Sequence, residues 1–366
     1  MVLVDARTIF LLKKQYKLCK RCAERHGITG SRSEDQCYIC RGLMDDLDSI
    51  AQKIARSIRG YEFDTFLIGA TLPTQIFERE DALRARLKIR GVESAKSQLT
   101  RELGMRLGRL LKKRVEYLKP DVTVNLAIDK GNNIDIAIKS RPLAIAGRYV
   151  KKIRGISQKQ DRCPNCEGKG CESCRYSGLS GFDSIEGAIA SGLIEMTGGQ
   201  TPRFSWIGSE DQNSLVLGSG RPFYARVFNP KKRKLKKKQI RKTGVMQASL
   251  SVLKEEPKLQ PRFKVTTRIH VRCERAITKD DIKKLGALDG VEVRFENKHK
   301  TATKKIHSAR ARRINDNQFV LTIVADGGLV IKQFVGGEEY MKPNVSEIVG
   351  AKCECVTFDV LDVSLQ

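Results

Sequence analysis

Residues 121–140 read DVTVNLAIDKGNNIDIAIKS. Apolar and polar residues alternate on either side of the turn KGN, which is the pattern of a hairpin of two half-buried strands. A hairpin of this kind buries one face, so it needs a layer of helices to cover that face. The hairpin therefore predicts a small α+β domain in this part of the chain.

The residues on both sides of the hairpin predict further helices and strands. Apolar residues recur at the helical period in residues 43–60 and 93–115, and YEFDTFLIGATL between them predicts a strand over residues 61–72. Downstream, residues 184–196 (SIEGAIASGLIEM) predict a helix, and strands and helices alternate to the C-terminus. We expect a second, larger α+β domain with a mixed sheet.

Composition indicates an intracellular protein with a polyanionic partner. The 366 residues include 69 Lys and Arg against 42 Asp and Glu, a net charge of +27, and such an excess favours nucleic acid. No stretch approaches the roughly 20 apolar residues of a membrane span. Asp5 and Arg7 interrupt the first apolar run too early for a signal peptide. We therefore expect a cytoplasmic protein that does not associate with membranes.

Eight of the eleven cysteines form four C-x-x-C pairs, which is metal-ligand spacing. The first two pairs predict one tetrahedral zinc site, which is structural because four thiolates leave no open position for water. The next two pairs predict a second zinc site on a compact loop, with a redox or empty dithiol pair as the alternative. The predicted ligands are Cys19, Cys22, Cys37 and Cys40 in the first site and Cys163, Cys166, Cys171 and Cys174 in the second.

The remaining cysteines, Cys273, Cys353 and Cys355, do not have this spacing. In C-E-C, Cys353 and Cys355 lie on one face of a predicted strand, where a free cysteine behaves as a small apolar residue. We assign all three to the core.

Residues 231–242, KKRKLKKKQIRK, carry nine basic residues in twelve. A solvated loop is the commoner meaning of such a run, but its charge matches a phosphate backbone and strands flank it. We favour contact with RNA or DNA over the solvated loop. The candidate contact residues are Lys231, Lys232, Arg233, Lys234, Lys236, Lys237 and Lys238.

Residues 206–223, WIGSEDQNSLVLGSGRPF, combine three glycines, paired acids and an Arg-Pro between two predicted strands. A carboxylate can act as nucleophile or base, and an arginine can hold a phosphate or a carboxylate. Asp211 is the candidate nucleophile. Taken alone, Asp211 could equally be a turn residue that binds its own backbone.

Residues 208–223 resemble the signature G-R-E-D-x-D-x-R-x-L-G-x-G-R-P-F of the archaeal and eukaryotic tRNA pseudouridine synthase family that modifies uridines 54 and 55 of the TΨC arm. RPLAIAGRY (141–149) and RGISQ (154–158) look like the end of that family's THUMP-type RNA-binding domain. Both cysteine groups are also similar to those of the archaeal members, so the resemblance extends over essentially the whole chain.

The resemblance implies a zinc-ribbon module with a helix at residues 1–60, a THUMP-type domain at 61–158, and a mixed-sheet catalytic domain at 159–366 that contains the second cysteine loop. It implies that Asp211 attacks the target nucleotide with no organic cofactor, and that Arg221 and Lys332 line the same cleft. The TΨC arm of tRNA would be the partner, and we expect a monomer. The implied RNA contacts upstream are Arg148, Tyr149, Lys151, Lys152 and Arg154.

Several positions depart from the family pattern. Ser209, Asn213 and Leu215 replace an Arg, an Asp and an Arg, and residues 264–272 lack the base-packing tyrosine. GLVIK (328–332) has Val330 at a second tyrosine position, and GEEYMKP (337–343) replaces D-x-G-R-T-x-P. We expect a synthase acting on uridine 55, with uridine 54 as a further candidate.

The missing tyrosines leave a second reading open, a tRNA-binding or folding factor with weak or no turnover. A thiolating or methylating enzyme is a third reading. That chemistry would need a glycine motif for ATP or a methyl donor, which the sequence lacks.

Overall fold

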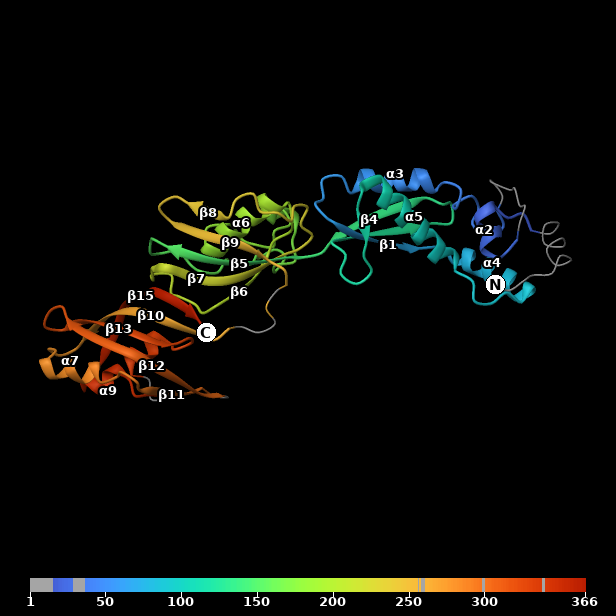
Figure 1. The fold of residues 1–366 in the computed structure, drawn as a ribbon. Coiled ribbons are helices and arrows are strands. Elements are labelled where there is room, and N and C mark those ends of the chain that lie inside the picture. Colours follow the sequence, from blue (N-terminus) through green and yellow to red (C-terminus); the bar gives the residue numbers. More distant parts are fainter. Residues whose placement is uncertain (1–15, 29–36, 256, 258–260, 298–299, 338–339) are drawn as a thin grey trace. The chain divides into compact units, whose positions relative to one another are not determined.

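The computed structural model (Figure 1) divides the chain into two compact units, residues 1–141 with 229–233, and residues 142–228 with 234–366. The apolar opening of the chain, most of the spacer between the first two C-x-x-C pairs, and residues 338 and 339 of GEEYMKP lie outside the described residues. In the described part of the chain, no helix combines the length and the apolar character needed to cross a membrane. The structure describes residues 16–28, 37–255, 257, 261–297, 300–337 and 340–366.

The first unit contains a four-stranded sheet in the order β2-β1-β3-β4. Its strands are β1 (Thr65–Thr71), β2 (Arg114–Val115), β3 (Val122–Ile128) and β4 (Ile134–Ser140). Strand β1 runs parallel to β2 and β3, and β3 pairs with β4 in the antiparallel register Val122↔Ser140 to Ile128↔Ile134. This register confirms the hairpin that the alternating sequence predicts.

The helices of this unit are α2 (Lys20–Arg25), α3 (Leu47–Ser57), α4 (Thr74–Leu87) and α5 (Ala95–Leu111). One hydrophobic cluster extends from Leu18 through the four cysteines of the first group to Ile128. Buried Arg25 on α2 donates from Nε to Glu80 on α4 at 2.9 Å and also to Gln98 on α5. The zinc-ribbon module and the α/β layer thus share one hydrophobic cluster.

In the second unit, eleven strands of the described residues form one sheet, in the order β14-β11-β12-β13-β10-β15-β7-β5-β9-β8 with β6 beside β7. Most neighbours are antiparallel, but β15 is parallel to β7, so the sheet is mixed as predicted. The strands are β5 (Leu143–Lys151), β6 (Arg203–Trp206), β7 (Val216–Val227), β8 (Gln239–Lys242), β9 (Met246–Leu253), β10 (Phe263–Cys273), β11 (Glu292–Asn297), β12 (Lys300–Arg313), β13 (Gln318–Asp326), β14 (Met341–Lys342) and β15 (Cys353–Leu365).

Two hydrophobic clusters fill this unit. One packs α6 (Ile185–Thr197) against β5, β7 and β9, and the other packs three helices against β10 to β13 and β15. Those three helices are α7 (Lys279–Gly286), α8 (Ile331–Gly336) and α9 (Val345–Val349). Strand β5 pairs with β7 and β9. Residues 142–158, which the sequence assigns to the THUMP-type domain, therefore lie in the second unit.

The three remaining cysteines are not all free core residues. Cys273 and Cys353 face each other at the ends of β10 and β15, with Cα atoms 4.2 Å apart, and form a disulfide. Both are buried, whereas Cys355 is free and half-buried. The sequence places Cys353 on the correct strand, but only the pairing of β10 with β15 brings Cys273 to it.

Candidate active site and metal centres

The loop between β6 and β7 brings Asp211 to the first residues of α8. Asp211 Oδ2 accepts a hydrogen bond from Lys332 Nζ at 2.7 Å, across 121 residues of sequence. The Asp211 side chain is 29% exposed and that of Lys332 60%, so a ligand in solution can reach both. The structure thus pairs two of the three residues that the resemblance places in the cleft, and the third, Arg221, lines the same cavity.

The other oxygen of Asp211 stabilises the loop. Asp211 Oδ1 accepts from the Asn213 N–H at 2.9 Å, and the Asp211 carbonyl accepts from the Ser214 N–H at 3.0 Å. Asp211 is therefore a turn residue as well as a partner of Lys332. The hydrogen bond from Lys332, and then the Asn213 N–H, hold the pKa of Asp211 below its ordinary value. The carboxylate is ionised at neutral pH, which is the form that can act as a nucleophile.

Arg221 lies beneath the loop and does not contact the Asp211 side chain in any described hydrogen bond. Its side chain is buried, and it donates to the carbonyls of Ile207 at 3.0 Å and Ser209 at 3.1 Å. Gly208 has φ +78°, and a Cβ there would lie 2.4 Å from an Arg221 nitrogen. Glycine at 208 is thus what allows Arg221 to hold the loop from below.

Buried Glu210 connects Arg221 to β5. Glu210 Oε2 lies 2.8 Å from Arg221 Nε, and both Glu210 oxygens accept from Tyr149 OH, at 2.6 and 2.7 Å. Gln158 donates to the Tyr149 oxygen at 2.9 Å. The sequence analysis did not predict this network. The alternation along β5 could have indicated it, because Tyr149 falls on the same face as Ile145 and Leu143.

Tyr149 and Lys151 are fully buried, so the predicted RNA contact does not include them. Lys151 Nζ donates to the carbonyls of Ile156 at 2.9 Å, Asp211 at 3.1 Å and Gln212 at 3.2 Å. Burial lowers the pKa of Lys151. Lys151 therefore supports the Asp211 loop from inside the protein.

The other three predicted contacts on this segment have different surroundings. Arg154 forms a two-pronged ion pair with Asp359 on β15, at 2.7 and 2.9 Å. The Arg148 guanidinium donates to Ser219 Oγ and to backbone carbonyls of β7 and β15. Lys152 is exposed. Arg154 and Arg148 thus hold neighbouring segments of the sheet in place, whereas Lys152 is accessible to a ligand.

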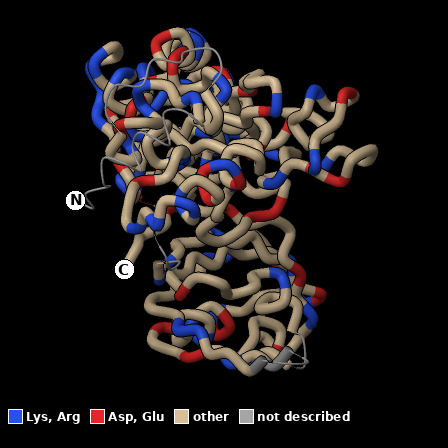
Figure 2. Tube along the Cα trace, turned by 90° about the vertical axis from the view of Figure 1, so that its right-hand side faces the viewer, with Lys and Arg blue, Asp and Glu red and all other residues tan. Residues whose placement is uncertain are grey.

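The lysine run contributes partly to packing. Arg233 donates to the Arg141 carbonyl at 2.7 Å and lies 3.6 Å from Asp121, and Lys232 lies 3.8 Å from Glu62. These residues belong to the first unit. Lys231 is exposed, as are Lys234, Lys236, Lys237 and Lys238. Lys and Arg positions occur along the whole trace rather than in this run alone (Figure 2).

Asp211 and Lys332 open into a cavity of about 340 Å³. Its walls come from β10, β13, β15, α8 and the residues just before α8. They include two phenylalanines, Phe263 and Phe358, beside Val265, Leu329 and Val330. A cavity with aromatic and aliphatic walls and a carboxylate and an ammonium among its lining groups suits a flat, polar-edged ring.

The first four cysteines fit a tetrahedral metal. Cys19, Cys22, Cys37 and Cys40 are buried, and their Sγ atoms lie within 4.8 Å of one another, with Cys19 and Cys40 3.7 Å apart. Zn–S bonds of about 2.3 Å place the sulfurs of a tetrahedral site about 3.8 Å apart. The donor set and its spacing therefore match zinc.

The second four cysteines also converge, on the loop between β5 and α6. Cys163 and Cys171, and likewise Cys166 and Cys174, have Sγ atoms 3.9 Å apart. Backbone N–H groups of Gly170 and Gly178 point at the sulfurs of Cys166 and Cys174, at 3.2 and 3.3 Å. Such N–H groups stabilise thiolates, so this loop also suits zinc. It is more exposed than the first site.

Known proteins resemble the chain over nearly its full length. Two family descriptions match, "Pus10, C-terminal" over residues 144–364 and "Pus10 THUMP domain, archaeal" over residues 50–127. A protein of Nitrosopumilus maritimus named tRNA pseudouridine synthase Pus10 is 34% identical, over 96% of each chain. Its namesake from Cenarchaeum symbiosum is 31% identical and covers 94% of this chain and 86% of its own length.

Among solved structures, a chain of a Cbf5-Nop10-Gar1 complex has a TM-score of 0.31 and 9% identity, and covers 59% of this chain and 58% of its own. A likeness this low supports no inference about function.

Proposed function

The chain belongs to the Pus10 family of tRNA pseudouridine synthases, as residues 208–223 predict, and on that premise we propose that it isomerises uridine 55 of the TΨC loop of tRNA, with uridine 54 as a second candidate target. The observation that carries the proposal is the ionised carboxylate of Asp211, which Lys332 holds among the lining groups of a cavity with aromatic walls.

In the proposed reaction Asp211 is the nucleophile. Its carboxylate attacks the target nucleotide, the bond between C1′ and N1 breaks, and the uracil turns within the cavity. A bond then forms between C1′ and C5 while the bond between Asp211 and the nucleotide breaks, which frees the carboxylate. C5 loses its proton, and N1 gains one. A carboxylate that is ionised at neutral pH needs no organic cofactor for these steps.

Lys332 and the network below the loop have separate roles. Lys332 lowers the pKa of Asp211 and holds its Oδ2 by a hydrogen bond. Arg221, Glu210 and Lys151 fix the backbone from which Asp211 projects, so they position the nucleophile. Arg221 thus acts on the loop, and because it also lines the cavity, it can contact the nucleotide as the resemblance implies.

The walls of the cavity favour an enzyme over a factor that only binds RNA. Val330 replaces a tyrosine of the family pattern at the mouth, but Phe263 and Phe358 line the same cavity and offer aromatic surface to a flipped base. Target uridines lie inside stacked RNA and have to leave the stack to react. Retention of Asp211 with a cationic partner is needless in a protein that only binds.

The test is release of tritium from an unmodified tRNA transcript labelled at C5 of uridine. We expect Asp211→Asn to abolish release while the melting temperature stays close to that of wild type. The matched control is Asp280→Asn, which removes another exposed carboxylate paired with a lysine, at 2.9 Å from Lys284. Tritium release by Asp211→Asn at the wild-type rate would show that Asp211 is not the nucleophile. Absence of release by wild type, with tight binding of tRNA, would favour the binding factor.

A further inference from the structure

The sheet formed by β8, β9, β5, β7 and β6 has two faces (Figure 1), and only one of them belongs to the site described above. Tyr149, Lys151 and Arg221 point to the face covered by α6 and the Asp211 loop. The strand register places their sequence neighbours on the opposite face.

This opposite face is basic. Cross-strand partners share a face, so the pairs Arg203↔Arg226, Val150↔Gln247 and Gln247↔Arg241 align residues from all five strands. The described positions of these five strands that share the face include four cations and no acidic residue, and Lys152, the residue after β5, adds a fifth cation beside them. These cations are Arg148, Lys152, Arg203, Arg226 and Arg241.

The middle of this face carries small side chains. Ala144, Ala146, Ser249 and Ser251 occupy its central positions, and both serines are exposed. Small side chains let another backbone approach the sheet closely, and serine hydroxyls donate hydrogen bonds to phosphate oxygens. A cation-rimmed surface with small side chains at its centre matches the charge of a sugar-phosphate chain.

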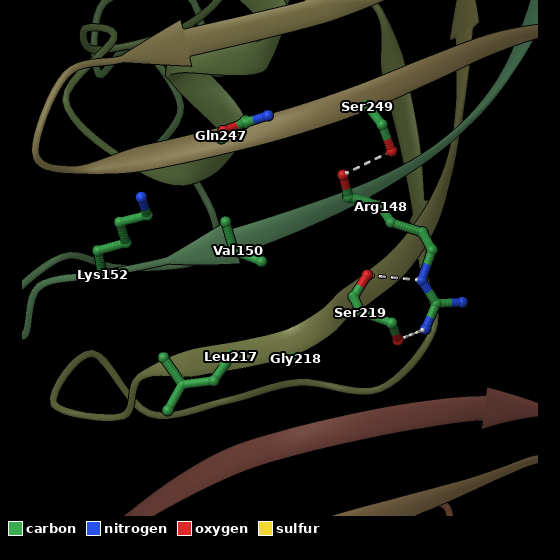
Figure 3. A pocket seen from close by; sticks show the side chains of 8 residues that line it. All are labelled: Arg148, Val150, Lys152, Leu217, Gly218, Ser219, Gln247 and Ser249. Carbon is green, nitrogen blue, oxygen red and sulfur yellow. Dashed lines mark hydrogen bonds between the residues drawn. The ribbon is translucent and has the colours of Figure 1, made fainter.

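A shallow cavity of about 430 Å³ lies on this face (Figure 3). Arg148, Val150 and Lys152 line it from β5, and Gln247 and Ser249 from β9. The Arg148 guanidinium donates to Ser219 Oγ at 2.7 Å, which fixes its position at one end, while Lys152 lies toward the other end. At this end Asp362 accepts a hydrogen bond from Ser219 Oγ, so the Ser219 hydroxyl already has a hydrogen-bond partner.

We propose that this face binds the phosphate backbone of the tRNA substrate, at a segment other than the one whose uridine enters the Asp211 cavity. The inference rests on the proposed function, since it assigns a second contact to the same RNA. Two contacts on one RNA reinforce each other, because the first raises the effective concentration of the second.

The test measures binding of an unmodified tRNA transcript to the full chain by fluorescence anisotropy over a range of salt concentrations. The variant Lys152→Glu/Arg241→Glu reverses two exposed cations of the face. We expect its Kd to rise by about tenfold or more, and the slope of log Kd against log salt to fall by about 2, one for each lost phosphate contact. At saturating tRNA, kcat should stay near the wild-type value while KM rises.

Lys279→Glu/Lys283→Glu is the matched control, because it makes the same charge change on exposed residues of α7. Ser249→Glu/Ser251→Glu is a second variant, which adds negative charge to exposed β9 positions and removes only side-chain hydrogen bonds of 3.4 Å, from the two hydroxyls to the carbonyls of Arg148 and Ala146. Both face variants should weaken binding while the α7 control binds as wild type.

Equal affinity of the face variants and the α7 control would overturn the proposal and would fit an acidic protein partner at this face instead. Failure of the wild-type chain to bind tRNA at all would overturn the proposed function as well, so the two failures are distinguishable.

Discussion

The two oxygens of Asp211 have different partners, and this division explains how one residue can both shape a loop and react. Oδ1 closes the turn with the Asn213 N–H, while Oδ2 is directed at Lys332. The hydrogen bond to the Asn213 N–H fixes the direction of the Asp211 side chain, and Lys332 favours its charged form. Asn213 departs from the family pattern in its side chain, yet the contact uses only its backbone, so the substitution leaves the turn intact.

Removal of the Lys332 charge should change the pH dependence of the reaction. In Lys332→Met the pKa of Asp211 rises toward its ordinary value, because the hydrogen-bond donor and the positive charge are both lost. The acid limb of the kcat/KM profile should therefore move to higher pH, and Lys332→Arg should restore it in part. The measurement is the pH profile of tritium release.

The stability of Lys332→Met provides the control. The pair contributes stability above the ordinary pKa of Asp211, and that contribution is lost as the pH falls through the lowered pKa. Because both side chains are partly exposed, the contribution at neutral pH is below about 1 kcal/mol. A large drop in melting temperature would show that Lys332 is a structural residue.

Glu210→Gln tests the buried network beneath the loop. The Arg221 side chain is 2% exposed and that of Glu210 is fully buried, so removal of the negative charge leaves Arg221 without a counter-ion. Loss of one partner of a buried ion pair costs about 3–5 kcal/mol. Urea unfolding should show a loss in this range, with Asp280→Asn unchanged. A loss below about 1 kcal/mol would contradict the assigned role.

At the scale of elements, the two cysteine groups sit in different surroundings. The first group begins at the N-cap of α2 and lies inside the hydrophobic cluster that also contains α3, α5 and the four-stranded sheet. The second group lies on a partly exposed loop whose one short helix is the 3₁₀ turn Glu172–Cys174. The first metal thus belongs to a core, and the second organises a loop.

Zinc removal should therefore affect the two sites differently. We expect two zinc ions per chain by mass spectrometry of metals, and a chelator should remove the ion of the 163–174 loop first. Cys37→Ser should destabilise the first unit strongly, since structural zinc supplies on the order of 10 kcal/mol. Cys166→Ser should leave the first unit's melting transition in place. Equal destabilisation by both variants would contradict this account.

The elements differ in how far the sequence could predict them. Alternation and helical periodicity correctly predicted the β3–β4 hairpin, α3, α5 and α6, because each of these buries one regular face. Residues 206–223 are expected to lie between two strands, but β7 already begins at Val216 and continues to Val227, because Gly218 and Gly220 at positive φ let the strand continue past an irregularity. Local sequence cannot show whether a glycine ends or bends a strand.

Local sequence also predicts the candidate site only in part. Residue type and motif spacing singled out Asp211 as the candidate nucleophile and both cysteine groups as candidate metal ligands, because Asp211 lies in a signature and the cysteines of each group lie close in sequence. The Glu210 network, the Cys273–Cys353 disulfide and the anchoring of Arg233 to the first unit depend on strand order and on contacts across tens of residues. Predicted contacts at Tyr149 and Lys151 fail because both side chains alternate inward along β5.

At the scale of the whole molecule, the net charge of +27 sets the behaviour toward RNA. Lysines and arginines are spread along the trace (Figure 2), so many weak phosphate contacts are available. Each neutralised phosphate releases counterions, which makes affinity fall steeply with salt.

Binding of tRNA should therefore weaken by orders of magnitude as salt rises, whether or not the RNA reacts. Asp211→Ala should follow the wild-type curve within a few-fold, because one loop carboxylate adds little to the total charge. Fluorescence anisotropy from low to high salt checks this expectation. A collapse of binding in Asp211→Ala at every salt concentration would mean that Asp211 maintains the binding surface rather than the chemistry.

The most direct test of the central claim is mapping of pseudouridine at single-nucleotide resolution in an unmodified tRNA transcript, after incubation with the wild-type chain and with Asp211→Asn. The account predicts pseudouridine in the TΨC loop, at position 55, with wild type and none with the variant. Tight binding of the transcript without pseudouridine at any position would contradict it.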